Sequence, residues 1–141
     1  MSDRLKAIVN ALPLTDGMRI LEIGCGTGVA ARGIVKRVSS CYMLAIDRSE
    51  TAIRQAVKGS SAEIESGRLS FRQVAIEHFE LEQDEALFDI AFAIRVGALD
   101  GRHPEIEKQA FTQIAKALKT NGRLFIDGGN PLKEVDLDPY R

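Results

Sequence analysis

Short apolar runs alternate with stretches of helical periodicity along the whole chain. Five runs have the length and composition of buried strands: residues 18–24, 41–47, 68–76, 88–94 and 123–129. Apolar residues recur at helical spacing in residues 2–14, 28–38, 49–67 and 103–122. Strands that are apolar on both faces are typical of a parallel sheet covered by helices on each side. The pattern therefore predicts an α/β fold, a three-layer, doubly wound sandwich with a mainly parallel sheet of about five strands.

The last predicted helix has start and stop signals at both ends. Pro104 stands in its first turn with Glu105, and His103 precedes it as a candidate cap. Gly122 stands where a left-handed C-terminal cap is expected. We therefore expect this helix to extend nearly to Gly122. The region 68–76 is the least apolar of the five strands, as an edge strand should be.

Length and composition limit the class of protein. At 141 residues the chain is about one domain long, so we expect residues 1–141 to form a single domain. The net charge of −1 argues against nucleic acid as a partner. No apolar run approaches the roughly 20 residues that cross a bilayer, and the N-terminus lacks a signal peptide core. Two cysteines form neither a disulfide scaffold nor a metal site, so we expect a cytoplasmic protein without a metal.

Residues 21–28, LEIGCGTG, place three glycines directly after the first predicted strand. Gly24, Gly26 and Gly28 allow a tight turn and a close approach of a ligand to the backbone. A dinucleotide pyrophosphate would need a third glycine where Val29 stands, and the acidic Glu22 would repel it. An acid at this place suits a ligand end that carries an ammonium group.

The segment ILEIGCGTG resembles the first motif of the class I S-adenosylmethionine-dependent methyltransferases, an acid followed by x-Gly-x-Gly-x-Gly. Asp47, 19 positions after Gly28, ends the second strand where that family has its ribose-binding acid. FDIAFAI and ALKTNGRLFID resemble the family's fourth strand and its helix–turn–fifth-strand segment. The resemblance covers roughly Leu12 to Gly129 and implies the Rossmann-like form of the fold predicted above.

The resemblance implies S-adenosylmethionine as cofactor and a role for each matching residue. Glu22 would orient the ammonium group, Asp47 would accept hydrogen bonds from both ribose hydroxyls, and Arg48 would border the adenine. Ala75 stands where the family often has an acid for the adenine amino group, so that contact is lost or displaced to Glu77. The other cofactor-binding residues implied are Gly24, Cys25, Gly26, Thr27, Gly28, Ile76 and Arg95.

No catalytic residue is identified, but Arg95 and Asp100 are weak candidates because they follow the fourth strand, where this family meets its acceptor. Arg95 ends an apolar strand, so its burial would require an acid such as Asp127 or Asp100, or an anionic ligand. Cys25 is better explained by packing in the loop than by nucleophilic chemistry. His103 is better explained as a cap than as a catalyst.

The family's sheet carries two further strands after the fifth, one of them antiparallel. Residues 129–141 are too few for the helix and hairpin that would supply both. The fifth strand would then be an uncovered apolar edge, which soluble proteins rarely tolerate. We expect the tail or a second copy of the chain to cover it, and hence a homodimer.

These observations leave three hypotheses open. The first is a methyltransferase that uses S-adenosylmethionine to methylate a small molecule in an open cleft; the family's nucleobase N-methylation signature is absent. The second is a non-catalytic partner or sensor protein that binds S-adenosylmethionine or S-adenosylhomocysteine. The third, a nicotinamide-dinucleotide protein, is disfavoured by Glu22 and Val29.

Overall fold

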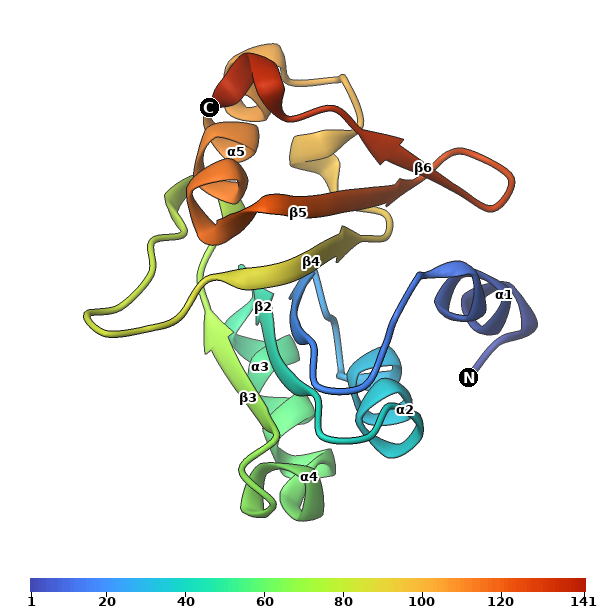
Figure 1. Ribbon diagram of the computed structural model, residues 1–141. Coiled ribbons are helices and arrows are strands. Elements are labelled where there is room, and N and C mark those ends of the chain that lie inside the picture. The colour runs from blue at the N-terminus through green and yellow to red at the C-terminus, as the bar shows by residue number, and fades with distance from the viewer.

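The computed structural model describes residues 1–141 and contains a twisted six-stranded sheet with helices on both faces (Figure 1). The strands are β1 (Arg19–Ile23), β2 (Tyr42–Asp47), β3 (Leu69–Gln73), β4 (Phe88–Ala93), β5 (Leu118–Asp127) and β6 (Leu132–Val135). Their order across the sheet is β3-β2-β1-β4-β5-β6, and only β6 is antiparallel to its neighbour. The strands β2 and β3 thus lie on one side of β1, and β4, β5 and β6 lie on its other side. The predicted α/β, doubly wound architecture is confirmed, with β3 at one edge.

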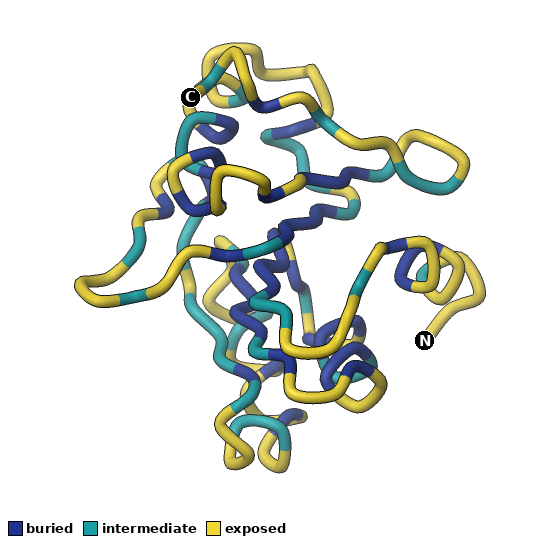
Figure 2. Tube along the Cα trace, in the orientation of Figure 1, coloured by how far each residue is buried: buried dark blue, intermediate teal, exposed yellow.

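The helices form the two outer layers. They are α1 (Asp3–Ala11), α2 (Val29–Arg37), α3 (Glu50–Gly59), α4 (Ser61–Glu65) and α5 (Pro104–Ala117), with short 3₁₀ turns η1 (Ile76–His78), η2 (Gly97–Leu99) and η3 (Asp138–Tyr140). Residues of α1 and α2 pack on one face of the sheet, whereas α5 and the three turns pack on the other. Figure 2 shows the buried residues concentrated along β1, β2 and β4 and on the inner sides of the helices. None of the helices is long and apolar enough to cross a bilayer.

Strand count is one point at which the prediction was incomplete. Residues 132–135 form β6, which pairs antiparallel with β5 from Leu124↔Val135 to Asp127↔Leu132. The chain therefore supplies one of the two strands that were expected to be missing. A tight turn at residues 128–131 replaces the connecting helix, and so few residues suffice. The tail itself covers the β5 edge, as one of the two expected alternatives proposed.

Helix boundaries differ from the prediction in two places. The predicted helix 49–67 is broken into α3 and α4 at Ser60, whose buried hydroxyl accepts a hydrogen bond from the Arg32 guanidinium at 3.0 Å. Helix α5 ends at Ala117, and Gly122 is not its left-handed cap. Gly122 instead lies in β5 at a register shift against β4, where a Cβ would come within 2.8 Å of the Leu118 Cβ. Close packing, rather than a left-handed backbone, requires this glycine.

Candidate functional site

The glycine loop between β1 and α2 lies beyond the carboxyl ends of β1 and β2, next to the position where the chain order reverses. Its backbone amides are largely engaged within the chain. The amides of Gly24 and Cys25 both donate to the Ile46 carbonyl, at 2.8 and 2.9 Å, and that of Gly28 donates to the Cys25 carbonyl at 3.1 Å. The Gly26 amide donates to Asp47 Oδ2 at 2.9 Å. A loop that binds phosphate needs free amides, and four of the five amides from Gly24 to Gly28 already have acceptors.

The three glycines have different steric surroundings, although all have left-handed φ angles of +74°, +56° and +86°. A Cβ on Gly24 would come within 2.6 Å of the Val96 side chain, and one on Gly28 within 3.1 Å of the Phe71 ring. A Cβ on Gly26 would meet no atom within 4 Å. Gly24 and Gly28 are therefore required by packing, whereas Gly26 borders open space that a ligand can enter.

Glu22 lies in β1 beneath the loop, between Ala45 of β2 and Phe92 of β4 in the sheet register. Its side chain is buried, and its Oε1 atom has no hydrogen-bond partner. Burial, and secondarily the negative charge of Asp47, raise the pKa of Glu22 to about 8. The carboxyl group is therefore mostly protonated at neutral pH in the absence of ligand. A cation placed beside it would favour the ionised form and lower this pKa.

Asp47, at the end of β2, connects the loop to the next helix. Its Oδ2 accepts from Gly26 and its Oδ1 accepts from the Ser49 amide at 2.9 Å. Ser49 caps α3 by accepting a hydrogen bond from Ala52, so this segment also begins a helix, as its sequence allowed. A carboxylate offers about four acceptor positions, so Asp47 keeps two for a ligand's hydroxyl groups.

A cavity of about 530 Å³ opens at the ends of β1, β2 and β3. It contains six of the predicted site residues and the flanking Ala75, and it leaves five predicted residues outside its walls. The predicted residues lining it are Gly24, Asp47, Arg48, Ile76, Glu77 and Arg95, while Glu22, Cys25, Gly26, Thr27 and Gly28 do not line it. Within it, Ala75 leaves no carboxylate at its own position, and the half-buried Glu77 is the nearest acid along the chain.

Further lining residues were not predicted. They are Ile23, Ile46, Val74, Gly97, Ala98, Arg102, His103 and Ile106, whereas Val96, expected with Arg95 to face the cofactor after the fourth strand, also lines the cavity. The first three end strands, so the rule that ligands bind at carboxyl ends could have identified them. The last three come from the loop before α5 and from its first turn, and no local pattern indicates that this loop folds over the cavity.

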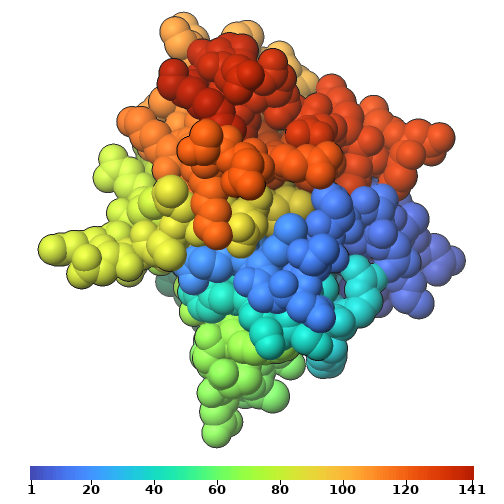
Figure 3. Space-filling view, viewed as in Figure 1, coloured from blue at the N-terminus to red at the C-terminus, as the bar shows by residue number.

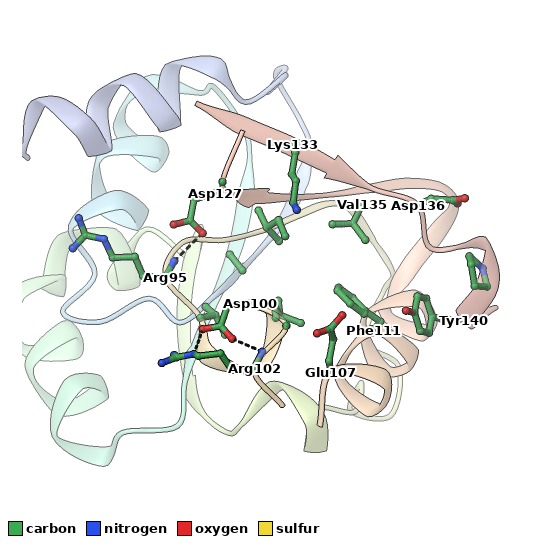
Figure 4. A pocket seen from close by; sticks show the side chains of 17 residues that line it. Arg95, Asp100, Arg102, Glu107, Phe111, Asp127, Lys133, Val135, Asp136 and Tyr140 are labelled. Carbon is green, nitrogen blue, oxygen red and sulfur yellow. Dashed lines mark hydrogen bonds and ion pairs between the residues drawn. The ribbon is translucent and has the colours of Figure 1, made fainter. Parts of the chain in front are cut away.

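Arg95 differs from its expected environment. It is exposed rather than buried, and no acid pairs with its guanidinium. The Asp127 carboxylate accepts instead the backbone amide of Arg95 at 3.1 Å and pairs with the Arg4 guanidinium at 3.5 Å (Figure 4). Arg95 has a left-handed φ of +58°, which is uncommon for a non-glycine residue and is often found at functional sites. The strand ends in a turn before Arg95, which explains why its side chain escapes burial.

Asp100, the other weak catalytic candidate, is exposed and pairs with Arg102 Nε at 2.6 Å. The Arg102 backbone amide and side chain hold the pKa of Asp100 below its ordinary value. The His103 side chain makes no capping hydrogen bond, although the residue stands at the N-cap of α5, so the predicted capping is wrong. His103 lies instead in the wall of the 530 Å³ cavity.

Cys25 is buried, and burial, followed by the charges of Glu22 and Asp47, raises the pKa of its thiol. A thiol that resists ionisation is a poor nucleophile, which agrees with a packing role. No group of three or more His, Cys, Asp or Glu side chains is arranged to hold a metal ion. The polar groups that line the cavity are the carboxylates of Asp47 and Glu77, the side chains of three arginines and His103, and backbone groups.

Comparison with known proteins places the chain among relatives of similar architecture. Residues 14–138 match a family model described as a methyltransferase domain. An O-methyltransferase of Pyrenophora dematioidea is 31% identical over 119 residues, which are 84% of this chain and 42% of that protein.

Two solved structures share the fold. The cyclase SpnF is 26% identical with a TM-score of 0.72 over 88% of this chain and 43% of its own. A methyltransferase from Thiobacillus denitrificans, in complex with S-adenosyl-L-homocysteine, is 20% identical with a TM-score of 0.69 over 89% of this chain and 48% of its own. The chain thus spans less than half the length of each of these proteins. Because the family model matches most of its residues, this chain belongs to the methyltransferase domain family.

Proposed function

We propose that the chain binds S-adenosylmethionine in the cavity beyond β1, β2 and β3 and transfers its methyl group to a small-molecule acceptor. The observation that carries this proposal is the cavity that Gly24 and Asp47 line, together with the open space at Gly26, whose amide donates to the same Asp47 carboxylate. The cavity volume of about 530 Å³ is in the range of small-ligand sites. The family membership and the names of the relatives support the same reading.

The residues present fit a nucleoside that carries an amino-acid tail. Glu22 holds an unpartnered buried oxygen that an ammonium group would satisfy. Asp47 keeps acceptor positions for ribose hydroxyls, and Ile76 offers an apolar wall for the base. A pyrophosphate is disfavoured for a reason different from the expected one. Glu22 is mostly neutral at pH 7, so its charge does not repel phosphate; the loop instead has few free amides to bind it.

For methyl transfer the protein mainly has to hold the methyl donor and the acceptor close together and in line. S-adenosylmethionine, when bound, supplies an electrophilic methyl group whose bond to sulfur breaks as an acceptor lone pair attacks in line, and the bonding electrons remain on sulfur. Val96 packs against Gly24 and lies in the walls of both this cavity and a second one beyond β4. The segment that begins at Arg95 would therefore position the acceptor relative to the cofactor.

The Gly26→Ala variant tests the proposal, with Gly17→Ala as its matched control. Both glycines have left-handed φ angles, and a Cβ on either one meets no protein atom within 4 Å. Both variants therefore carry similar backbone strain, but only Gly26 borders the proposed ligand. We expect Gly26→Ala to weaken S-adenosylhomocysteine binding about tenfold or more, since one excess methyl group in a packed site costs about 1–3 kcal/mol. Isothermal titration calorimetry measures the affinities.

Equal affinities for the two variants would contradict the proposed position of the ligand. Tight binding of NAD in place of S-adenosylhomocysteine would contradict its identity. The alternative of a non-catalytic binding or sensor protein predicts binding without turnover. Formation of S-adenosylhomocysteine from S-adenosylmethionine in the presence of acceptor mixtures distinguishes an enzyme from a binding protein. This assay is needed because the chain shares its fold with SpnF, which is named as a cyclase.

The remaining features of the proposal concern the whole chain. We infer that residues 1–141 act as one domain with a small-molecule substrate, without nucleic acid, and in the cytoplasm, where the free buried thiols of Cys25 and Cys41 would stay reduced. The homodimer stays a prediction, but its main reason is removed because β6 covers the β5 edge. Sedimentation of the purified chain measures its oligomeric state.

A further inference from the structure

A second cavity, of about 750 Å³, lies beyond the ends of β4 and β5 and is not explained by cofactor binding. Its walls come from η2, the first turns of α5, β6 and η3 (Figure 4). It shares Arg95, Val96 and Arg102 with the first cavity, so the two spaces meet at the turn after β4. A molecule in the second cavity would thus lie next to the bound cofactor.

One side of this cavity offers an aromatic and apolar surface. The rings of Phe111 and Tyr140 lie 5.0 Å apart between centroids and are tilted by 41°. Ile126 and Val135 continue this surface along β5 and β6. Phe111 is almost completely buried, whereas Tyr140 is half-buried and its hydroxyl end points toward the interior of the cavity in Figure 4. A flat ring fits against such a surface.

Lys133 lies in β6, the edge strand next to β5, and is exposed. It pairs with Ile126 in the sheet register, and Ile126 belongs to the face that α5 covers. Its side chain therefore projects on the same side of the sheet, and Figure 4 shows its ammonium group directed into the cavity. This ammonium group forms no ion pair or hydrogen bond within the chain, although four acids line the same cavity.

Three of those four acids already have donors. Asp100 pairs with Arg102, Asp127 accepts from the Arg95 amide and pairs with Arg4, and Asp136 accepts from the Asp138 amide at 3.0 Å. Asp136 also points away from the cavity in Figure 4. The half-buried Glu107 is the remaining acid and has no partner. The cavity thus presents the free ammonium group of Lys133 and one free hydrogen-bond acceptor beside an aromatic surface, while the unpaired Arg95 guanidinium points away from the cavity in Figure 4.

We propose that the second cavity binds the methyl acceptor and selects a hydroxylated aromatic carboxylic acid. The carboxylate of such a ligand pairs with Lys133, its ring packs on Tyr140 and Phe111, and a hydroxyl group donates to Glu107. This inference rests on the proposed function, because the cavity receives an acceptor only if the first cavity holds the cofactor. A charged group on Lys133 sets selectivity, whereas the aromatic surface supplies affinity for any ring of similar size.

Three probes of nearly equal size test the charge preference: 4-hydroxybenzoate, neutral 4-hydroxybenzamide and cationic 4-hydroxybenzylamine. Each is titrated calorimetrically into the full chain, with and without saturating S-adenosylhomocysteine. We expect 4-hydroxybenzoate to bind most tightly. Lys133→Met should weaken 4-hydroxybenzoate binding about tenfold, in line with the loss of one charge-assisted hydrogen bond, and leave 4-hydroxybenzamide binding unchanged. Lys58→Met, which removes an exposed lysine of α3, is the matched control and should change neither.

The outcomes separate the two proposals. Binding of S-adenosylhomocysteine without binding of 4-hydroxybenzoate would overturn the acceptor class and leave the proposed function intact. Equal binding of all three probes, or equal binding of 4-hydroxybenzoate by the Lys133→Met and Lys58→Met variants, would also overturn the acceptor class. Failure of S-adenosylhomocysteine to bind would overturn the proposed function itself. Circular dichroism checks the fold of the Lys133→Met variant, and we expect no change because the replaced ammonium group forms no ion pair or hydrogen bond in the chain.

Discussion

The two cavities at the carboxyl edge of the sheet are built in different ways. The one beyond β1, β2 and β3 consists of strand ends, a glycine loop held by its own amides, and two acids that form no ion pair. The one beyond β4 and β5 consists of a loop, a helix turn and the tail, with acids held by arginines at its edge. The first is fixed by the sheet, and the second by segments added around it.

This difference indicates which cavity can be shared by a whole family and which can vary from one member to another. A cavity made of strand ends and backbone keeps its form as long as the sheet does, so it suits a ligand common to a whole family. A cavity made of side chains on a hairpin and on terminal segments changes with few substitutions. Figure 3 shows the tail and the N-terminal segment side by side on one face, and the Arg4–Asp127 pair connects them. We therefore expect selectivity for the proposed acceptor to come from that region.

The largest expected effect concerns Glu22, the buried acid beneath the glycine loop. Glu22 has its pKa raised from 4.5 to about 8 in the folded chain. Between these pH values the folded state keeps a proton that the unfolded state loses, so the free energy of unfolding falls as pH rises and levels off above pH 8. Glu22→Gln has no such dependence. We expect the variant to gain up to about 5 kcal/mol over the parent between pH 4.5 and 8, at about 1.4 kcal/mol per pKa unit.

Urea unfolding of the chain and the variant at several pH values measures this difference without ligand. Glu65→Gln, which replaces an exposed glutamate of α4, controls for the loss of a carboxyl group as such. If the gain from Glu22→Gln were the same at every pH, Glu22 would be as well hydrated as the acids of the second cavity. Glu22 would then provide no electrostatic difference between the two cavities.

The second effect concerns binding in the first cavity. Asp47→Ala removes the carboxylate that faces this cavity, and we expect a loss of about 1–3 kcal/mol in binding of S-adenosylhomocysteine, or about ten- to a hundredfold. The matched control is Asp89→Ala, at the opposite end of the sheet. Asp89 likewise accepts a backbone amide, from Arg19 at 2.8 Å, and it pairs with Lys119.

Both variants should lower the melting temperature, because each leaves a backbone amide without its acceptor. Only Asp47→Ala should change the dissociation constant measured by calorimetry. An unchanged affinity for Asp47→Ala would remove Asp47 from the proposed ribose contact. An equal loss for both variants would show that stability, and not contact with the ligand, sets the affinity.

The same difference explains how much of the molecule could be predicted from its sequence. The strands, their parallel arrangement and the glycine loop follow from local periodicity and from the spacing between Gly28 and Asp47, since sheet topology converts that spacing into proximity. The lysine of the second cavity could not be predicted, because Lys133 has meaning only once β6 pairs with β5. Nor could Tyr140, which reaches Phe111 only because the tail folds back onto α5.

Errors in the prediction have physical causes of the same kind. Arg95 was expected to need an acid because it follows an apolar strand, but a left-handed turn directs its side chain outward. Gly122 has the sequence context of a helix cap, yet the pairing of Phe88 with Leu118 ends the helix earlier. Backbone conformation thus explains the first error, and tertiary pairing that overrode a local signal explains the second. Six of the eleven residues predicted to bind the cofactor line the first cavity, among them Asp47, which ends β2.

The smallest expected effect concerns Asp127, which joins the second cavity to α1. Its carboxylate accepts the Arg95 amide and pairs with Arg4, whose side chain is 57% exposed. Asp127→Asn keeps an oxygen for the amide and loses only the charge, so we expect a loss of less than about 1 kcal/mol of stability. Asp127→Ala also removes the acceptor and should lose about 1 kcal/mol more. Thermal unfolding of both variants measures these losses, and Arg4→Ala combined with Asp127→Asn should add nothing further. If Asp127→Asn were as damaging as Asp127→Ala, the ion pair would hold the turn after β4, and salt would then weaken the second cavity but not the first.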